Sequence, residues 1–124
     1  MPLPAQPTRP ESGMGRGTIP FPCMSLSFLF HMFLHVAVPV AVAWLFFRRD
    51  FKRAALIMVA ANLIDVDHLL ADPIVDPDRC SVGFHLLHQY WIIPVYVLMA
   101  LIPKTRLIGM GLVIHIVLDY IDCL

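Results

Sequence analysis

The sequence predicts an all-α fold, namely a polytopic membrane four-helix bundle that follows a disordered N-terminal tail. The chain has 124 residues, of which 59% are hydrophobic and 15% are charged, whereas soluble domains average about 25% charged residues. The apolar residues form long continuous runs, which are typical of helices in a bilayer and unlike the alternating pattern of membrane β-barrels. Because the net charge is zero, we expect no nucleic-acid partner.

Residues 1–24 are predicted to be a disordered tail, because they are rich in proline and glycine and have no periodic apolar pattern. The apolar stretch that follows is too long for a signal peptide, and no small-residue cleavage site closes it. Met14 and Met24 are alternative starting residues, so the tail could lie outside the translated protein. Residues 25–124 then form one domain of four transmembrane helices.

Four apolar segments of this domain are each expected to cross the membrane as a helix. The first has roughly 23 residues, which is enough to span a bilayer. Pro39 lies within it and should either kink the helix or be packed by a neighbour. The expected segments are 25–47, 54–71, a third that begins near His85 or Tyr90 and ends at Pro103, and 107–124.

The loops predict the orientation of these segments. The connection after the first segment, RRDFKR, holds four basic residues, and the connection after the third holds a lysine and an arginine. The loop between the second and third segments is acidic, with Asp72, Asp76 and Asp78 against a single basic residue, Arg79. Because basic loops stay in the cytoplasm, we expect both basic connections to be cytoplasmic. The four segments then form a multi-pass protein of the inner (cell) membrane. Both termini and the acidic loop then lie on the periplasmic side.

Histidine and aspartate gather at one depth of this predicted bundle. All six histidines fall in the outer half of the segments or beside the acidic loop. An ionised side chain within a membrane costs about 2.5 kcal/mol or more, so such residues are usually paired and functional. Their spacing of three or four residues places each pair on one helix face. The predicted metal ligands are His31, His35, Asp65, His68, His85, His88, His115 and Asp119.

Helix bundles hold metal ions by means of paired ligands that project inward from facing helices. Imidazole together with carboxylate suits divalent ions such as zinc, iron or manganese. We therefore predict a divalent metal, with zinc as the leading candidate, and the set is large enough for one or two ions. The alternative for each histidine is an interhelical hydrogen bond, and His31 is also a candidate for a supporting role behind the other ligands.

Asp67 and Arg79 are the predicted catalytic residues. Asp67 lies on a different helix face from Asp65, so it is a candidate general base, with a supporting or solvated role as the alternative. Within the four-helix domain, Arg79 is the only basic residue expected on the outer side, where its guanidinium would bind an anionic group such as phosphate through two hydrogen bonds. A plain ion pair with Asp76 or Asp78 is the alternative for Arg79.

Three cysteines, Cys23, Cys80 and Cys123, also fall on the predicted outer side. Pairing of Cys80 with Cys123 is conceivable in an oxidising compartment. An odd number leaves one cysteine over, and no CxxC spacing occurs, so the sequence does not predict a disulfide framework.

The stretch DVDHLLADPIVDPDRCSVGFHLLH, with HMFLH before it and GLVIHIVLDYIDC after it, resembles an uncharacterised bacterial family of small integral membrane proteins over about residues 28–124. The order of motifs is more distantly similar to the YdjM-type membrane-bound metal-dependent hydrolases, although HLLH stands here in place of their HR…THS element. That resemblance implies a helical, multi-zinc hydrolase of phosphoesters. The positions that match its motifs are His35, Asp65, Asp67, His68, His85, His88, His115 and Asp119.

Three functions are therefore open at the level of sequence. The first is a metal-dependent (zinc) hydrolase of a membrane lipid or other phosphoester at the outer leaflet. The second is a non-catalytic metal-binding or metal-handling membrane protein, such as a sensor or a component of a transporter, and four helices could form a homo-oligomer around a pathway. The third is a di-iron membrane oxidase: HMFLH fits the first histidine box of that class, but no HxxHH follows.

Overall fold

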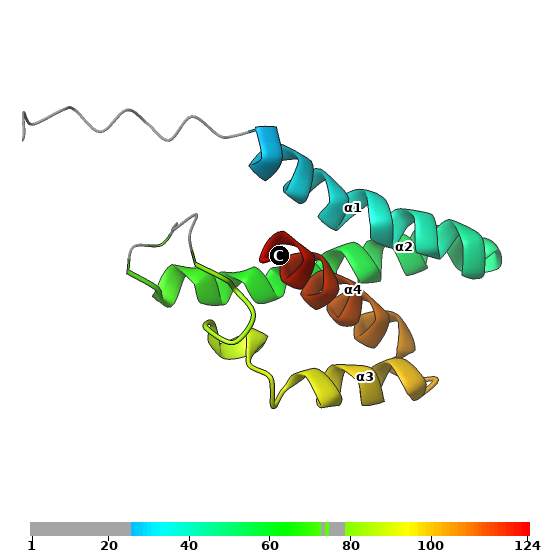
Figure 1. Ribbon diagram of the computed structural model, residues 1–124. Helices are drawn as coiled ribbons and strands as arrows, with labels where there is room; N and C mark the ends of the chain where they lie inside the picture. The colour runs from blue at the N-terminus through cyan, green and yellow to red at the C-terminus, as the bar shows by residue number, and fades with distance from the viewer. Residues whose placement is uncertain (1–25, 73, 75–78) are drawn as a thin grey trace, which may run out of the picture.

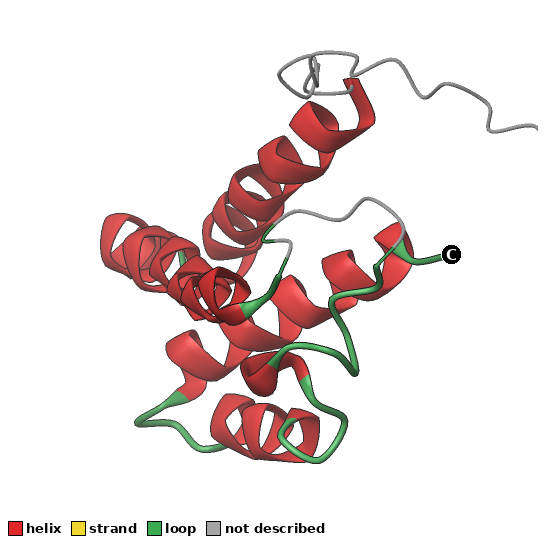
Figure 2. Cartoon of the chain, turned by 90° about the vertical axis from the view of Figure 1, so that its left-hand side faces the viewer, coloured by secondary structure: helices red, strands yellow, loops and turns green. Residues whose placement is uncertain are grey.

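The structure is a computed structural model that describes residues 26–72, 74 and 79–124. In these residues the chain is helical, with four α-helices and no strand (Figure 1), as the sequence predicts. Figure 2 shows helices and loops in this part of the chain. The predictions for the tail, for Cys23 and for Asp76 and Asp78 concern residues outside the described ranges.

The first predicted segment is the helix α1, Leu26–Phe46, whose bounds agree with the prediction. Its 21 residues extend about 32 Å, and it is the one described helix that is both long and apolar enough to cross a membrane. Pro39 lies inside it and is buried, so this proline is packed by its neighbours, which was one of the two predicted outcomes.

The second predicted segment is divided between two types of helix. After a short 3₁₀ turn, η1 (Arg48–Asp50), the α-helix α2 covers Phe51–Ala60 and continues directly as a 3₁₀-helix, η2 (Ala61–Leu70). A 3₁₀-helix rises about 2.0 Å per residue and an α-helix 1.5 Å, so the two together extend about 35 Å. Side chains three residues apart lie above one another in η2, because a 3₁₀-helix has three residues per turn.

The third predicted segment starts later than the sequence suggested. His85 and His88 lie in a loop and a single 3₁₀ turn, η3 (Leu86–His88), and the helix α3 covers only Ile93–Leu101. Pro94 explains this start, because proline lacks an N–H and is favoured in the first turn of a helix. The nine residues of α3 extend about 14 Å, which is less than the thickness of a bilayer.

The last helix, α4 (Arg106–Asp122), is the centre of the fold. It contacts α1, α2, α3 and η2, and in Figure 1 it lies between the α1–α2 pair and α3. Gly111 permits its close approach to α2, since a Cβ there would lie 2.7 Å from the Met58 carbonyl oxygen and 2.8 Å from Ala61 Cβ. The polar positions of α4 therefore face those of α1 and η2.

The close approach at Gly111 yields a test of the packing. Alanine is favoured over glycine in a helix by about 1 kcal/mol, but overpacking costs roughly 1–3 kcal/mol. We therefore expect Gly111→Ala to lower the thermal unfolding temperature of the detergent-solubilised protein, while Val117→Ala, at a half-exposed position of the same helix, leaves it nearly unchanged. An unchanged or higher unfolding temperature for Gly111→Ala would contradict the contact between α2 and α4.

Candidate metal centre

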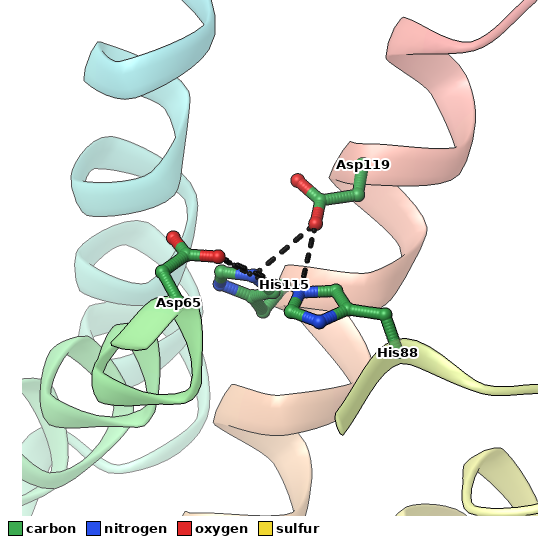
Figure 3. Close-up of side chains that lie close together, drawn as sticks. All are labelled: Asp65, His88, His115 and Asp119. Atoms are coloured by element: carbon green, nitrogen blue, oxygen red, sulfur yellow. Dashed lines mark hydrogen bonds and ion pairs between the residues drawn. The ribbon is translucent and has the colours of Figure 1, made fainter. Parts of the chain in front are cut away.

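Four side chains from three separate elements point toward one another in the interior (Figure 3). Asp65 comes from η2, His88 from η3, and His115 and Asp119 from α4. His88 and His115 are almost completely buried, and Asp119 is 6% exposed. We call this set the central group. Its four ligand atoms all lie within 4.8 Å of one another, which is the arrangement that a metal site requires.

The distances within the central group fall in a narrow range. The two Nε2 atoms of His88 and His115 are 3.1 Å apart. Oδ1 of Asp65 lies 3.5 Å from the His88 Nε2 atom and 3.1 Å from that of His115. Oδ2 of Asp119 lies 3.2 Å and 3.3 Å from the same two nitrogens. The four atoms therefore enclose a small space about as wide as one ion.

The other ring nitrogens fix the direction of each histidine's lone pair. His115 Nδ1 lies 2.9 Å from Oδ1 of Asn62, whose amide donates to the His35 carbonyl oxygen. His88 Nδ1 lies 3.1 Å from Oδ2 of Asp67. Both Nδ1 atoms thus donate their proton, because the oxygen facing each is an acceptor. In the neutral rings both Nε2 atoms then carry lone pairs, and they face each other beside two carboxylate oxygens.

A second group, which we call the outer group, shares Asp119 with the central group. It consists of His31, His35 and Asp119. Oδ1 of Asp119 lies 3.2 Å from His31 Nε2 and 3.1 Å from His35 Nε2, while its Oδ2 faces the central group. The His35 Nδ1–H donates to the His31 carbonyl oxygen, so its Nε2 also presents a lone pair. Asp119 thus bridges the two groups.

Two buried atoms at this bridge have no hydrogen-bond partner among the described residues, namely His35 Nε2 and Asp119 Oδ2. An unsatisfied buried polar atom is costly and rare in a native protein. Both atoms point into the two groups, where a bound cation would satisfy them.

The third group is Asp67, His68 and His85, which we call the peripheral group. Asp67 Oδ1 lies 3.1 Å from His68 Nδ1, and the two imidazole rings stack with 3.8 Å between their centres. The spacing His85/His88 was predicted to form one pair, yet these two histidines belong to different groups. They diverge because they lie in a loop and a 3₁₀ turn rather than on one α-helix.

The loop that carries His85 and His88 is held by its own backbone. Gly83 has φ of +86°, a conformation that residues with side chains rarely adopt. Its N–H donates to the His88 carbonyl oxygen. The hydroxyl of Tyr96 donates to the Leu87 carbonyl oxygen, and the Leu87 N–H donates to Asp67. The turn at Gly83 and the start of α3 therefore fix where His88 points.

Two residues that contact the three groups were not predicted from the sequence. Asn62 orients His115 and contacts the backbone at His35, and Ser81 Oγ lies 3.1 Å from His68 Nε2. Asn62 precedes Asp65 by three residues in the same helical segment, so its spacing was a usable signal. Ser81 lies in a loop, where spacing carries no such information.

A cavity of about 280 Å³ opens beside the outer group. Its lining includes His31 and Asp119 of that group, together with Arg79, Ser81 and Asp122. The Arg79 guanidinium carbon lies 4.4 Å from the centre of the Phe84 ring. Asp67, the predicted general base, is buried and does not line this cavity; both of its oxygens face donors, so its catalytic role stays a prediction.

His85 and His88, which lie outside the four α-helices, have pKa values that are shifted in opposite directions. Burial lowers the pKa of His85, and the neighbouring His68 adds to this effect. Burial also opposes a charge on His88, but contacts with Asp119, Asp65 and Asp67 outweigh it and raise the pKa of that imidazole to about 10. The carboxylates therefore create a strong local preference for positive charge at His88.

Cys80 and Cys123 form a disulfide, with 5.3 Å between their Cα atoms. The bond ties the segment before η3 to the C-terminal end of α4, and both cysteines line the cavity. Pairing of these two was conceivable from the sequence, although no disulfide was predicted. The two cysteines are 43 positions apart, so their proximity in space could not be predicted from the sequence alone.

The chain belongs to the Family of unknown function (DUF6122), whose family model matches residues 25–124. This membership agrees with the resemblance to an uncharacterised family, whereas the more distant likeness to YdjM-type hydrolases stays a prediction. No curated protein and no solved structure matches the chain. The functional argument therefore depends on the geometry of the three groups.

The disulfide can be checked by alkylation and intact mass. Since the full chain has three cysteines, we expect one alkyl group on the denatured, unreduced protein and three after reduction. Cys80→Ser should carry two without reduction, because its loss frees Cys123. Three alkyl groups on the unreduced wild-type protein, isolated with its thiols trapped during lysis, would contradict the pairing.

Proposed function

We propose that this protein is an integral membrane hydrolase of phosphoesters that holds two divalent metal ions, one in the central and one in the outer group. The observation that carries the proposal is the set of five distances, 3.1–3.5 Å, between the ligand atoms of the central group. Zinc bonds of about 2.0–2.1 Å in a tetrahedron place neighbouring ligand atoms about 3.3–3.4 Å apart. These five distances are close to that value, and the remaining pair of ligand atoms, one oxygen each of Asp65 and Asp119, lies within 4.8 Å.

The two groups differ in a way that separates structural from catalytic metal sites. Structural zinc sites have four protein ligands, whereas catalytic sites have three and leave a fourth position open. The central group offers four ligands, and the outer group offers three beside the cavity. We therefore assign the chemistry to the outer group and a supporting role to the central group, with Asp119 as the ligand that joins them.

The cavity supplies the groups that a phosphoester needs. A divalent ion lowers the pKa of bound water toward 7 and polarises a phosphoryl oxygen. Arg79 would bind the remaining anionic oxygens through its planar fork of donors. Asp122 is the exposed carboxylate at this cavity, and its Oδ1 lies 3.7 Å from His31 Nδ1, where it can orient that ring or accept a proton. Asp67 orients His88, since its oxygens are already engaged.

The surface of the protein supports a membrane location. Only 17% of the most apolar 18-residue stretch of α1 is buried, whereas a core helix of a soluble protein would be mostly buried. Large apolar side chains are also exposed on α2, η2, α3 and α4, while four histidines and two aspartates are buried. This inverted distribution suits a lipid environment, and α2 with η2 is long enough to form a second span. We extend the proposal to a multi-pass topology on these grounds.

Two independent features support the expected orientation, in which the basic turn after α1 lies in the cytoplasm and the metal groups lie on the periplasmic side. Arg48 lies 17 residues after His31, so the basic turn is about 25 Å along the helix axis from the outer group. Its guanidinium stacks on Trp44, 4.7 Å from the ring centre, as aromatic residues at a membrane interface commonly do. The disulfide lies at the end with the metal groups, and disulfides persist in oxidising compartments such as the periplasm.

Metal content tests the two-ion centre. Protein purified in detergent without chelators is expected to retain two divalent ions per chain by elemental analysis. Asp119→Ala should lose both, because Asp119 contributes an oxygen to each group, and His31→Ala should lose one. Asp50→Asn, an exposed carboxylate at the basic turn, serves as the control and should retain both. A wild-type chain that retains no metal would overturn the proposal.

Activity tests the assignment of Arg79. Loss of a charge-assisted hydrogen bond costs about 1.5–3 kcal/mol, so Arg79→Gln should lower kcat/KM for phosphoester hydrolysis roughly 10- to 150-fold. Arg79→Lys should recover part of the loss, and neither change should alter the metal content. The substrates would be phosphatidylglycerol vesicles and soluble bis(4-nitrophenyl) phosphate, which separate lipid from free phosphodiesters. A fully metallated wild-type protein that is inactive on both would instead be a non-catalytic metal-binding protein.

A further inference from the structure

We propose that the peripheral group is a separate divalent-cation site. Its ion exchanges with ions in solution, and its occupancy is coupled to that of the central group through Asp67. The site would take a borderline ion such as zinc, because its ligand atoms are two imidazole nitrogens and one carboxylate oxygen. Its three ligand atoms lie within 4.8 Å of one another. The Asp67 Oδ1 to His68 Nδ1 distance of 3.1 Å falls within the range found in the central group.

The chemistry of His68 allows it to hold either a cation or a proton at Nδ1. Its Nε2 lies 3.1 Å from Ser81 Oγ, and a hydroxyl can both donate and accept a hydrogen bond. When a cation occupies Nδ1, the Nε2–H donates to Ser81; when Nδ1 keeps a proton, the Ser81 hydroxyl donates instead. In the loaded state Ser81 thus accepts from the Nε2–H and orients the Nδ1 lone pair of His68 toward the cation.

His85 supplies the third ligand atom. The residue is 5% exposed, and its ring makes no side-chain hydrogen bond to any residue that the structure describes. It stacks instead on His68, with 3.8 Å between ring centres and a 30° angle between the planes. Nearly parallel rings that face one carboxylate place their nitrogens side by side, which is where an ion could bind both.

The number of ligands and the exposure of one histidine distinguish this site from the central group. The His68 side chain is 27% exposed, compared with 0% for His88 and His115, although Asp65 of the central group is 34% exposed. Its partner Ser81 lines the cavity that opens to solvent. The peripheral site also has three ligands against four in the central group. Its ion should therefore bind more weakly and exchange faster than the ion of the central group.

Asp67 connects the peripheral site to the central group. Its Oδ1 faces His68, and its Oδ2 accepts the His88 Nδ1–H at 3.1 Å. A carboxylate that accepts from a ligating histidine raises the basicity of that ligand. A cation on Oδ1 withdraws charge from Asp67 and so weakens this effect on His88. Occupancy of the two sites is thus linked, and the linkage is reciprocal. This coupling, unlike the peripheral site itself, rests on the proposed central ion.

The test is a zinc titration of the full chain in detergent, after dialysis into metal-free buffer and in competition with a chromophoric chelator. We expect the wild-type protein to retain two ions and to take up one further ion reversibly. His85→Gln should abolish this uptake and keep the two retained ions, and Ser81→Ala should weaken the uptake alone. Asp72→Asn, an exposed carboxylate, is the matched control and should behave as the wild type.

Asp67→Asn separates the coupling from the site. It should abolish the further uptake and also release the retained ions roughly 10- to 100-fold more readily, as expected when the carboxylate behind a ligating histidine is lost. Unaltered release in Asp67→Asn would overturn the coupling. Two retained ions with no further uptake by the wild type would overturn the peripheral site alone. Uptake that depends on His85 in a chain that retains nothing would support the peripheral site and overturn the two-ion centre.

Discussion

When the rings of His88 and His115 are neutral, four lone pairs meet in the interior of this protein, from their two Nε2 atoms and from one oxygen each of Asp65 and Asp119. Such atoms repel one another unless a positive charge lies between them, and burial in a medium of low dielectric constant strengthens the repulsion. Much of the structure serves to hold them there. Asn62 and Asp67 turn the two rings, the Gly83 turn places His88, and Gly111 brings α4 against α2.

This constraint also accounts for the inverted character of the molecule. Among the described residues four histidines and two aspartates are buried, while large apolar side chains are exposed on all four α-helices. In water that distribution would be unfavourable, because burial of apolar surface is the main stabilising contribution to folding. In a bilayer the helices gain little from burying leucine or phenylalanine, so bonds between polar ligands and a shared cation can become the interactions that hold the helices together.

The sequence predicted the helical fold and the bounds of α1 and α4 well, since both are long apolar runs with clear ends. It placed the start of α3 too early, because the apolar run begins before Pro94, whereas proline favours the first turn of a helix. Every predicted ligand falls in one of the three groups, but the division among them was not predictable. That division depends on the 3₁₀ geometry of η2 and on the turn at Gly83, which bring together residues far apart in the sequence.

The central claim is that a metal ion supplies the positive charge that the four ligand atoms of the central group require. X-ray absorption spectroscopy at the metal edge of the protein as purified tests it most directly. The account predicts nitrogen and oxygen neighbours at about 2.0–2.1 Å, with the outer-shell scattering of imidazole rings. Sulfur at about 2.3 Å in the first coordination shell, or neighbours without imidazole scattering, would contradict it.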